Sequence, residues 1–214
     1  IVGVLCARYL GINQLVTPVS SNTAVDACGW FDGVYRTRIG SPYVIEQMNQ
    51  ALAEGTGSVA GYEANGGFLL ASDITLNGQS LTALPTRDAV LPMLSILASA
   101  RQQGCPVSQL VAALPPRYTA SDRLKNFPTD MSRQKIAELA ASEAAINDLF
   151  GDLCGKLKST DETDGLRITF ENDEIVHLRP SGNAPELRCY NEASSQERVQ
   201  ILNQACLERL AAWR

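Results

Sequence analysis

The chain has 214 residues, 45% of them hydrophobic and 19% charged, which is the composition of a globular protein with a buried core and not of a disordered or fibrous chain. Its formal net charge of -5 and its pI near 5.0 exclude the broad positive field that attracts nucleic acid or anionic membranes. The longest uncharged apolar run, residues 89–100, is shorter than the roughly 18 residues that a membrane span needs. We therefore expect no nucleic-acid and no membrane partner, and an anion would have to be bound by a few local groups.

The cysteines are scattered, with no CxxC pair and no histidine close enough in sequence to complete a metal site; they are Cys6, Cys28, Cys105, Cys154, Cys189 and Cys206. We expect reduced, mostly buried thiols in a cytoplasmic protein. The sequence starts at Ile1 and not at methionine, and Arg8 interrupts its first apolar run before it could form the core of a signal peptide. We therefore expect a missing N-terminal part.

Short strands and helices alternate in the first half of the chain. Strands are expected at 14–18, 33–37, 58–62 and 68–72, and helices at 1–10, 24–30, 43–54, 88–104 and 108–114. The helix at 88–104 is amphipathic, with an apolar side formed by Val90, Leu91, Leu94, Leu97 and Ala98. This alternation predicts an α/β domain with a mixed sheet over residues 1–116.

The second half is organised differently. Pro115-Pro116 ends the alternation, and the polar segment 117–128 is interpreted as the domain boundary and as a hinge. A helix is expected at 132–150, a hairpin of strands 165–171 and 175–178 around Asn172-Asp173, and then a strand at 186–191 and a final helix. These elements predict a smaller α+β domain over residues 117–214, with an antiparallel sheet and two helices.

The most informative segment is the turn Arg-Pro-Ser-Gly-Asn-Ala-Pro-Glu-Leu-Arg, from Arg179 to Arg188, which joins two expected strands. Ser181 and Asn183 carry side-chain donors, and Gly182 lets successive N–H groups turn into one concavity. Arg179 adds a forked positive charge, and an internal ion pair that occupied its guanidinium would count against phosphate binding at this turn. Such a turn can hold a phosphate, although on composition alone the string is also an ordinary polar turn.

This turn resembles the phosphate-binding loop of the α-D-phosphohexomutases, which usually runs R-P-S-G-T-E-P followed by L-R. The sequence departs from that pattern at Asn183 and Ala184, and the Asn-Ala version is similar to that of bacterial phosphomannomutases. The resemblance implies that the phosphate not being transferred is held by Arg179, Ser181, Gly182, Asn183 and Arg188.

A second segment, Gly-Tyr-Glu-Ala-Asn-Gly-Gly at 61–67, falls where this family keeps its sugar-recognition loop. The resemblance implies that Glu63 and Asn65 bind two adjacent sugar hydroxyls, with Gly66 in the same turn. Many relatives have a histidine near Gly67, which is absent here. Without the family, the segment is a solvent-exposed turn.

A third segment, 36–42, resembles the family's motif of a basic residue shortly before a glycine and a helix, and Arg38 stands at the matching position. In relatives this residue is often a lysine proposed to assist proton transfer. An arginine keeps its proton, so Arg38 is a catalytic candidate for electrostatic stabilisation, or a surface residue without a role. His177, the only histidine, is interpreted as a packed or rim residue.

Two motifs of the family are missing. Its phosphoserine loop, usually T-A-S-H-N-P, and its magnesium loop, D-G-D-G-D-R, do not occur in the sequence. The chain therefore resembles only the third and fourth domains, which implies that Mg²⁺ is bound outside this chain, that the fragment itself holds no metal, and that the missing N-terminal domains are its partners.

The implied function is that of a phosphomannomutase fragment. The whole protein would interconvert mannose 6-phosphate and mannose 1-phosphate through a phosphoserine and a bisphosphorylated sugar, with a hexose phosphate as substrate, and the isolated chain would be inactive because aligned transfer needs the missing parts. Two alternatives stay open: a non-catalytic module that binds sugar phosphates, and a fragment of a phosphoglucomutase or phosphoglucosamine mutase.

Overall fold

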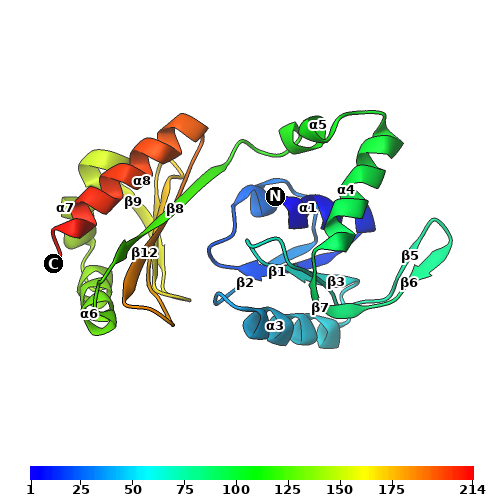
Figure 1. Ribbon diagram of the computed structural model, residues 1–214, viewed down its shortest axis with the longest axis horizontal. Helices are drawn as coiled ribbons and strands as arrows, with labels where there is room; N and C mark the ends of the chain where they lie inside the picture. Colours follow the sequence, from blue (N-terminus) through cyan, green and yellow to red (C-terminus); the bar gives the residue numbers. More distant parts are fainter. The chain divides into compact units, whose positions relative to one another are not determined.

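The computed structural model describes residues 1–214 and divides into two compact units, Ile1–Pro115 and Pro116–Arg214, here called domain 1 and domain 2 (Figure 1). The expected fold class is confirmed, since domain 1 holds a mixed sheet and domain 2 an antiparallel one, each with helices. A bilayer-spanning helix is not found among its elements.

The main sheet of domain 1 has the strand order β2-β1-β3-β4-β7. Its first three strands are parallel, and the last two run antiparallel to their neighbours. A separate two-stranded hairpin follows β4. The strands are β1 (Gln14–Pro18), β2 (Gly33–Thr37), β3 (Val59–Tyr62), β4 (Phe68–Leu70), β5 (Ile74–Leu76), β6 (Gln79–Leu81) and β7 (Leu84–Asp88).

Helices cover both faces of this sheet because its central strands are apolar on both sides. Leu15 of β1 packs among residues of α1, α4 and α5, whereas its neighbour Val16 packs against α3. A Cβ on Gly61 of β3 would lie 2.5 Å from Val44, so α3 approaches the sheet too closely for any larger residue there. The helices are α1 (Val2–Leu10), α2 (Ala24–Ala27), α3 (Ser41–Glu54), α4 (Val90–Gln103) and α5 (Val107–Ala112).

The apolar side of α4 does not face the core, which is opposite to what amphipathic spacing normally means. Its side chains at positions 90, 94 and 97 are each 60% exposed, and Met93 is 59% exposed. The buried side is formed by Pro92, Ser95, Ile96 and Ala100. Small residues on that side allow α4 to lie close to α1, so close helix packing, and not the hydrophobicity of the stripe, sets the rotation of the helix.

Domain 2 is an antiparallel sheet, β8-β12-β11-β10-β9, with helices on one face (Figure 1). Alternation along β10 sends Leu166, Ile168 and Phe170 into the core beneath the helices. Asp173 has φ of 62° in the β10–β11 turn, so the hairpin around Asn172-Asp173 is confirmed. The elements are β8 (Tyr118–Lys125), β9 (Leu157–Asp161), β10 (Leu166–Phe170), β11 (Ile175–Pro180), β12 (Glu186–Ala193), α6 (Thr129–Ala140), α7 (Glu143–Cys154) and α8 (Gln196–Ala211).

Two predictions for this half are wrong. Segment 117–128 is not a hinge, because β8 pairs with β12 at eight consecutive positions, from Tyr118 opposite Ala193 to Lys125 opposite Glu186. The single helix predicted at 132–150 is two helices. Its break is caused by Ser142, whose hydroxyl caps α7 by accepting a hydrogen bond from the backbone N–H of Ala145 at 3.2 Å.

The orientation of α4 can be tested by paired truncations. Ile96→Ala, at a site 9% exposed, should lower the free energy of unfolding of domain 1 by about 2 to 4 kcal/mol, whereas Leu94→Ala should change it by less than about 0.5 kcal/mol. Urea unfolding followed by Trp30 fluorescence, in a Trp213→Phe background, measures this domain alone, since each domain has one tryptophan. Equal losses for the two variants would contradict the observed rotation.

Candidate functional site

The parallel strands of domain 1 end at one edge of the sheet. β2, β1 and β3 are paired in register, so the residues that follow their carboxyl ends come together there. Open α/β sheets place ligands at such an edge. Here it brings together Arg38 after β2, the loop 19–23 after β1, and Glu63 after β3.

Glu63 is the buried carboxylate of this edge, with only 8% of the residue exposed. The hydroxyl of Ser41 donates to its Oε2 at 2.7 Å, and Nε of Arg87 lies 3.8 Å from the same oxygen. A carboxylate accepts about four hydrogen bonds, so capacity remains for a ligand. The sequence interpretation missed both Ser41, the first residue of α3, and Arg87, which comes from β7.

The turn after Glu63 is held by its own backbone. The N–H of Glu63 donates to the carbonyl of Gly67 at 2.9 Å, and Gly66 has φ of 91°, a left-handed conformation that favours glycine. The side-chain oxygen of Asn65 accepts from the N–H of Gly67 at 3.0 Å. The amide NH₂ of Asn65 is therefore the part of that side chain left to meet a hydroxyl.

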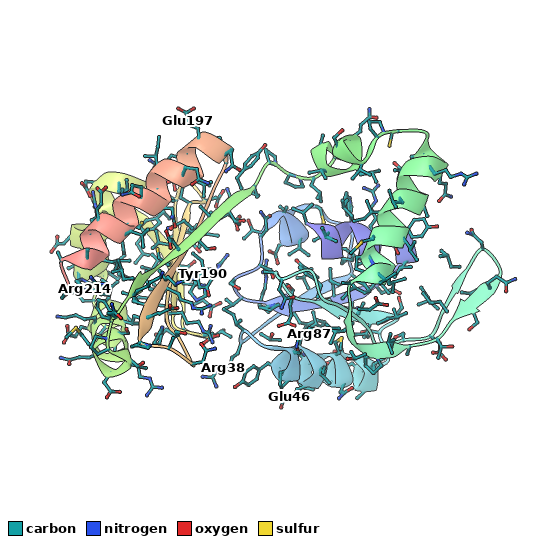
Figure 2. All side chains as sticks on the ribbon, in the orientation of Figure 1. Arg38, Glu46, Arg87, Tyr190, Glu197 and Arg214 are labelled. Carbon is teal, nitrogen blue, oxygen red and sulfur yellow. The ribbon has the colours of Figure 1, made fainter.

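Arg38 lies at the same edge but is exposed, with its guanidinium 5.5 Å from the ring centre of Tyr43. Both Arg38 and Arg87 lie beside α3, the helix that carries Glu46 (Figure 2). The loop that follows β2 contacts the buried carboxylate of Glu63 through Ser41, three residues after Arg38.

The turn of domain 2 between β11 and β12 offers backbone donors. Its ends are fixed by hydrogen bonds from the N–H of Ser181 to the carbonyl of Glu186 at 2.9 Å and from the N–H of Phe127 to Pro185 at 2.8 Å. The N–H groups of residues 182–184 make no such internal bond. Gly182 has no positive φ, and a Cβ added to it would meet no atom within 4 Å, so the protein leaves open space beside it. Consecutive unpaired N–H groups of this kind are suited to an anion.

The side chains of the turn differ from the expectation in one respect. The hydroxyl of Ser181, a buried residue, donates to the side-chain oxygen of Asn183 at 3.0 Å. A hydroxyl has one hydrogen to donate, so Ser181 orients Asn183 in this state. The donor of the pair that stays available is the amide nitrogen of Asn183.

Arg179 makes an internal ion pair, the outcome that counts against phosphate binding at this turn. Its Nε lies 2.9 Å from the Oδ2 of Asp164, and both side chains are largely buried. A phosphate at this turn would meet a carboxylate of the same charge sign beside the arginine. The guanidinium has five N–H donors, and a pair made through Nε leaves it further donors for a second anion.

Strand pairing sets two further arginines beside Arg179. In the register of β11, β12 and β8, Arg179 lies opposite Arg188, and Arg188 opposite Arg123. The carboxylate of Glu186 forms ion pairs with both Arg188, at 3.5 Å, and Arg123, at 3.2 Å. Three guanidinium groups thus face two carboxylates, an excess of positive charge that attracts anions. The sequence interpretation missed Arg123 and Glu186 because only pairing across strands reveals them, and it missed Asp164 because the turn between β9 and β10 brings that residue to Arg179.

His177 is a packed residue of the same sheet face, 1% exposed, with its ring 5.4 Å from that of Tyr190 (Tyr190 is labelled in Figure 2). Its Nε2 donates to the carbonyl of Asp164 at 2.7 Å, which leaves Nδ1 buried without a partner. Burial lowers the pKa of His177 below its ordinary value, and the hydrogen bond to Asp164 opposes this in part.

The stability of domain 2 should therefore depend on this histidine at mildly acidic pH. Between the lowered folded pKa and the ordinary value near 6.5, the unfolded chain binds a proton that the folded chain does not, so stability falls as pH decreases through this window. His177→Gln, which keeps a donor for Asp164, should flatten the loss between about pH 7.5 and 5.5. Unfolding followed by Trp213 fluorescence in a Trp30→Phe background measures it, and identical pH profiles would contradict the assignment.

No group of three or more His, Cys, Asp or Glu side chains in the structure could hold a metal ion. All six cysteines are free thiols and four of them are buried, as expected; Cys28 and Cys105 are half-buried.

Comparisons with known families cover both domains. Residues 1–118 match the family model "Phosphoglucomutase/phosphomannomutase, alpha/beta/alpha domain III", and residues 124–208 match "Phosphoglucomutase/phosphomannomutase, C-terminal domain". The two matches follow the two domains of the structure in order.

Curated relatives include a phosphomannomutase from Sinorhizobium fredii, 45% identical over 202 residues, and one from Salmonella muenchen, 44% identical over 197 residues. These alignments include 94% and 92% of this chain but 42% and 41% of the relatives, so the chain spans about two fifths of their length. A phosphoglucomutase/phosphomannomutase from Thermococcus kodakarensis is 28% identical over 197 residues.

Solved structures share the fold. A phosphoglucomutase/phosphomannomutase family protein from Burkholderia thailandensis aligns with a TM-score of 0.65 at 15% identity, over 99% of this chain and 41% of its own. An N-acetylphosphoglucosamine mutase from Aspergillus fumigatus, in complex with GlcNAc-6P and magnesium, aligns with a TM-score of 0.65 at 14% identity, over 99% of this chain and 43% of its own.

Proposed function

The chain belongs to the phosphoglucomutase/phosphomannomutase family, and from this premise we propose that it is the sugar- and phosphate-binding part of a phosphomannomutase that interconverts mannose 6-phosphate and mannose 1-phosphate. The observation that carries the proposal is the pair of turns: one begins with a buried carboxylate at the carboxyl ends of the parallel strands, and the other leaves three successive N–H groups beside a row of arginines. A carboxylate suits sugar hydroxyls, and amides with guanidinium groups suit a phosphate dianion.

Mannose is favoured over other hexoses by the relatives. Two phosphomannomutases are 44–45% identical to the chain, whereas relatives described as probable phosphoglucosamine mutases are 24–26% identical. Fragments of a glucosamine or glucose enzyme remain the second candidate, because the fold itself is common to all of them.

In the proposed division of labour, Glu63 and Asn65 bind adjacent hydroxyls of the ring, and the turn at 182–184 with Arg179 and Arg188 holds the phosphate that is not transferred. Ser41 orients Glu63, and Ser181 orients Asn183. Arg38 keeps its charge and is exposed at the sugar-binding edge, so its proposed contribution is electrostatic.

The transfer step itself needs groups that this chain does not supply. Phosphoryl transfer depends on an aligned donor and on a cation that offsets the charge on the moving group. We propose that the phosphoserine and the magnesium site lie in the part of the protein that precedes this chain, and that the whole enzyme works in the cytoplasm.

The isolated chain should therefore bind but not turn over. Purified chain mixed with mannose 6-phosphate, glucose 1,6-bisphosphate and Mg²⁺ should form no mannose 1-phosphate above background, followed by ³¹P NMR. Conversion by the chain alone would contradict the assignment of the chemistry to other domains.

The phosphate turn can be tested by calorimetry with mannose 6-phosphate. Arg179→Ala should weaken binding by about 2 kcal/mol, roughly 30-fold, because a charge-assisted hydrogen bond is lost. Asp164→Asn should strengthen binding several-fold, since it removes a like charge beside the phosphate.

Gly182→Ala is the matched steric probe. Because no protein atom lies near the added methyl group, the melting temperature should not change, while a phosphate seated on the turn would be displaced and binding weakened. If the wild-type chain binds mannose 6-phosphate and all three variants bind it with unchanged affinity, phosphate binding at this turn is contradicted.

A further inference from the structure

Gly67 leaves space for an arginine. Its φ is not in the left-handed region, so the backbone does not require glycine at this position. A Cβ added there would lie 3.0 Å from both Cγ and Cδ of Arg87 and 3.2 Å from Oδ1 of Asn65. The aliphatic stem of Arg87 therefore packs directly against this glycine, and a larger residue at position 67 would have to displace it slightly.

Irregular strand pairing brings Arg87 to this position. Phe68 of β4 lies opposite Asp88 of β7, but Leu70 lies opposite Leu84, so a step of two residues along β4 corresponds to a step of four along β7. Such a bulge changes the direction of side chains at a sheet edge. Arg87 lies within it and is directed beside the sugar-recognition turn.

The charged end of Arg87 is positioned to share a ligand with Glu63. Its side chain is 60% exposed, whereas that of Glu63 is 8% exposed, so the arginine lies on the solvent side of the pair. Their closest atoms, Nε and Oε2, are 3.8 Å apart, too far for a direct hydrogen bond. A hydroxyl oxygen at about 2.7 to 3.0 Å from both atoms would bridge them, accepting from the guanidinium and donating to the carboxylate.

Ser41 completes the geometry from the other side. Its hydroxyl holds Oε2 of Glu63 at 2.7 Å, which fixes the carboxylate while Arg87 stays movable. The pair thus offers a donor and an acceptor at one point, which suits a sugar hydroxyl better than an isolated phosphate.

We propose that Arg87 is a substrate-binding residue, which clamps one hydroxyl of the sugar phosphate together with Glu63 and for which Gly67 provides the space. This inference rests on the proposed function of the turn at 63–67. It assigns to Arg87 a recognition role that its sequence context does not indicate.

The test is a titration of this chain with mannose 6-phosphate and with inorganic phosphate as the hydroxyl-free probe. Arg87→Ala should weaken mannose 6-phosphate binding by about tenfold and leave inorganic phosphate binding unchanged. Arg87→Lys, which keeps the charge but loses the fork, should recover part of the loss. Arg101→Ala, on the exposed surface of α4, is the matched control and should change neither affinity.

A double-mutant cycle tests whether Arg87 and Glu63 bind the same hydroxyl, and the single variants distinguish the role of Arg87 from the proposed function. If Arg87 and Glu63 share one hydroxyl, Glu63→Gln combined with Arg87→Ala should weaken binding by less than the product of the single effects. Loss on Glu63→Gln with no loss on Arg87→Ala would overturn the role of Arg87 and leave the proposed function intact. Failure of the wild-type chain to bind mannose 6-phosphate at all would instead overturn the proposed function. An equal loss for both probes would show a general charge effect and also overturn the clamp.

Discussion

The parallel pairing of β1 with β2 and β3 is the constraint on which the proposed sugar-binding turn depends. Parallel strands end together, so the residues after each strand are gathered at one edge however far apart they are in sequence. Glu63 can be buried there because Ser41, 22 residues earlier, donates to it from the first turn of α3. A buried carboxylate without such a partner would cost folding free energy, so the same contact that prepares the site also makes it compatible with the fold.

In domain 2, antiparallel pairing brings together side chains of the opposite charge. The register of β8, β12 and β11 places Arg123, Arg188 and Arg179 across neighbouring strands, where like charges destabilise a sheet. Glu186 and Asp164 offset part of that repulsion. Because the two carboxylates do not fully balance the three arginines, the surface still attracts anions. The repulsion that remains between the arginines does not prevent the strands from pairing. The same balance explains why Arg179 is paired, since an unpaired, largely buried guanidinium would be costly. The sequence interpretation considered the loop alone and not the β9–β10 turn, which carries Asp164.

Local patterns predicted much of the fold. The strands at 14–18 and 33–37 have the expected bounds, because turn residues and apolar runs mark them clearly. The pattern failed where packing decides: α4 exposes its apolar stripe because small residues pack on α1. The same limit applies to the site. The two turns of the candidate site can be recognised as turns in the sequence, whereas Ser41, Arg87 and Asp164 reach them only through the folded sheets.

The central claim is that the turn at 63–67 binds sugar hydroxyls and the turn at 182–184 binds phosphate. The most direct measurement is a ¹⁵N-resolved NMR titration of this chain with mannose 6-phosphate and, separately, with inorganic phosphate. We predict that the backbone amides of 182–184 shift with both ligands, whereas those of 63–67 shift only with the sugar phosphate. Shifts confined to other surfaces with either ligand would contradict the claim.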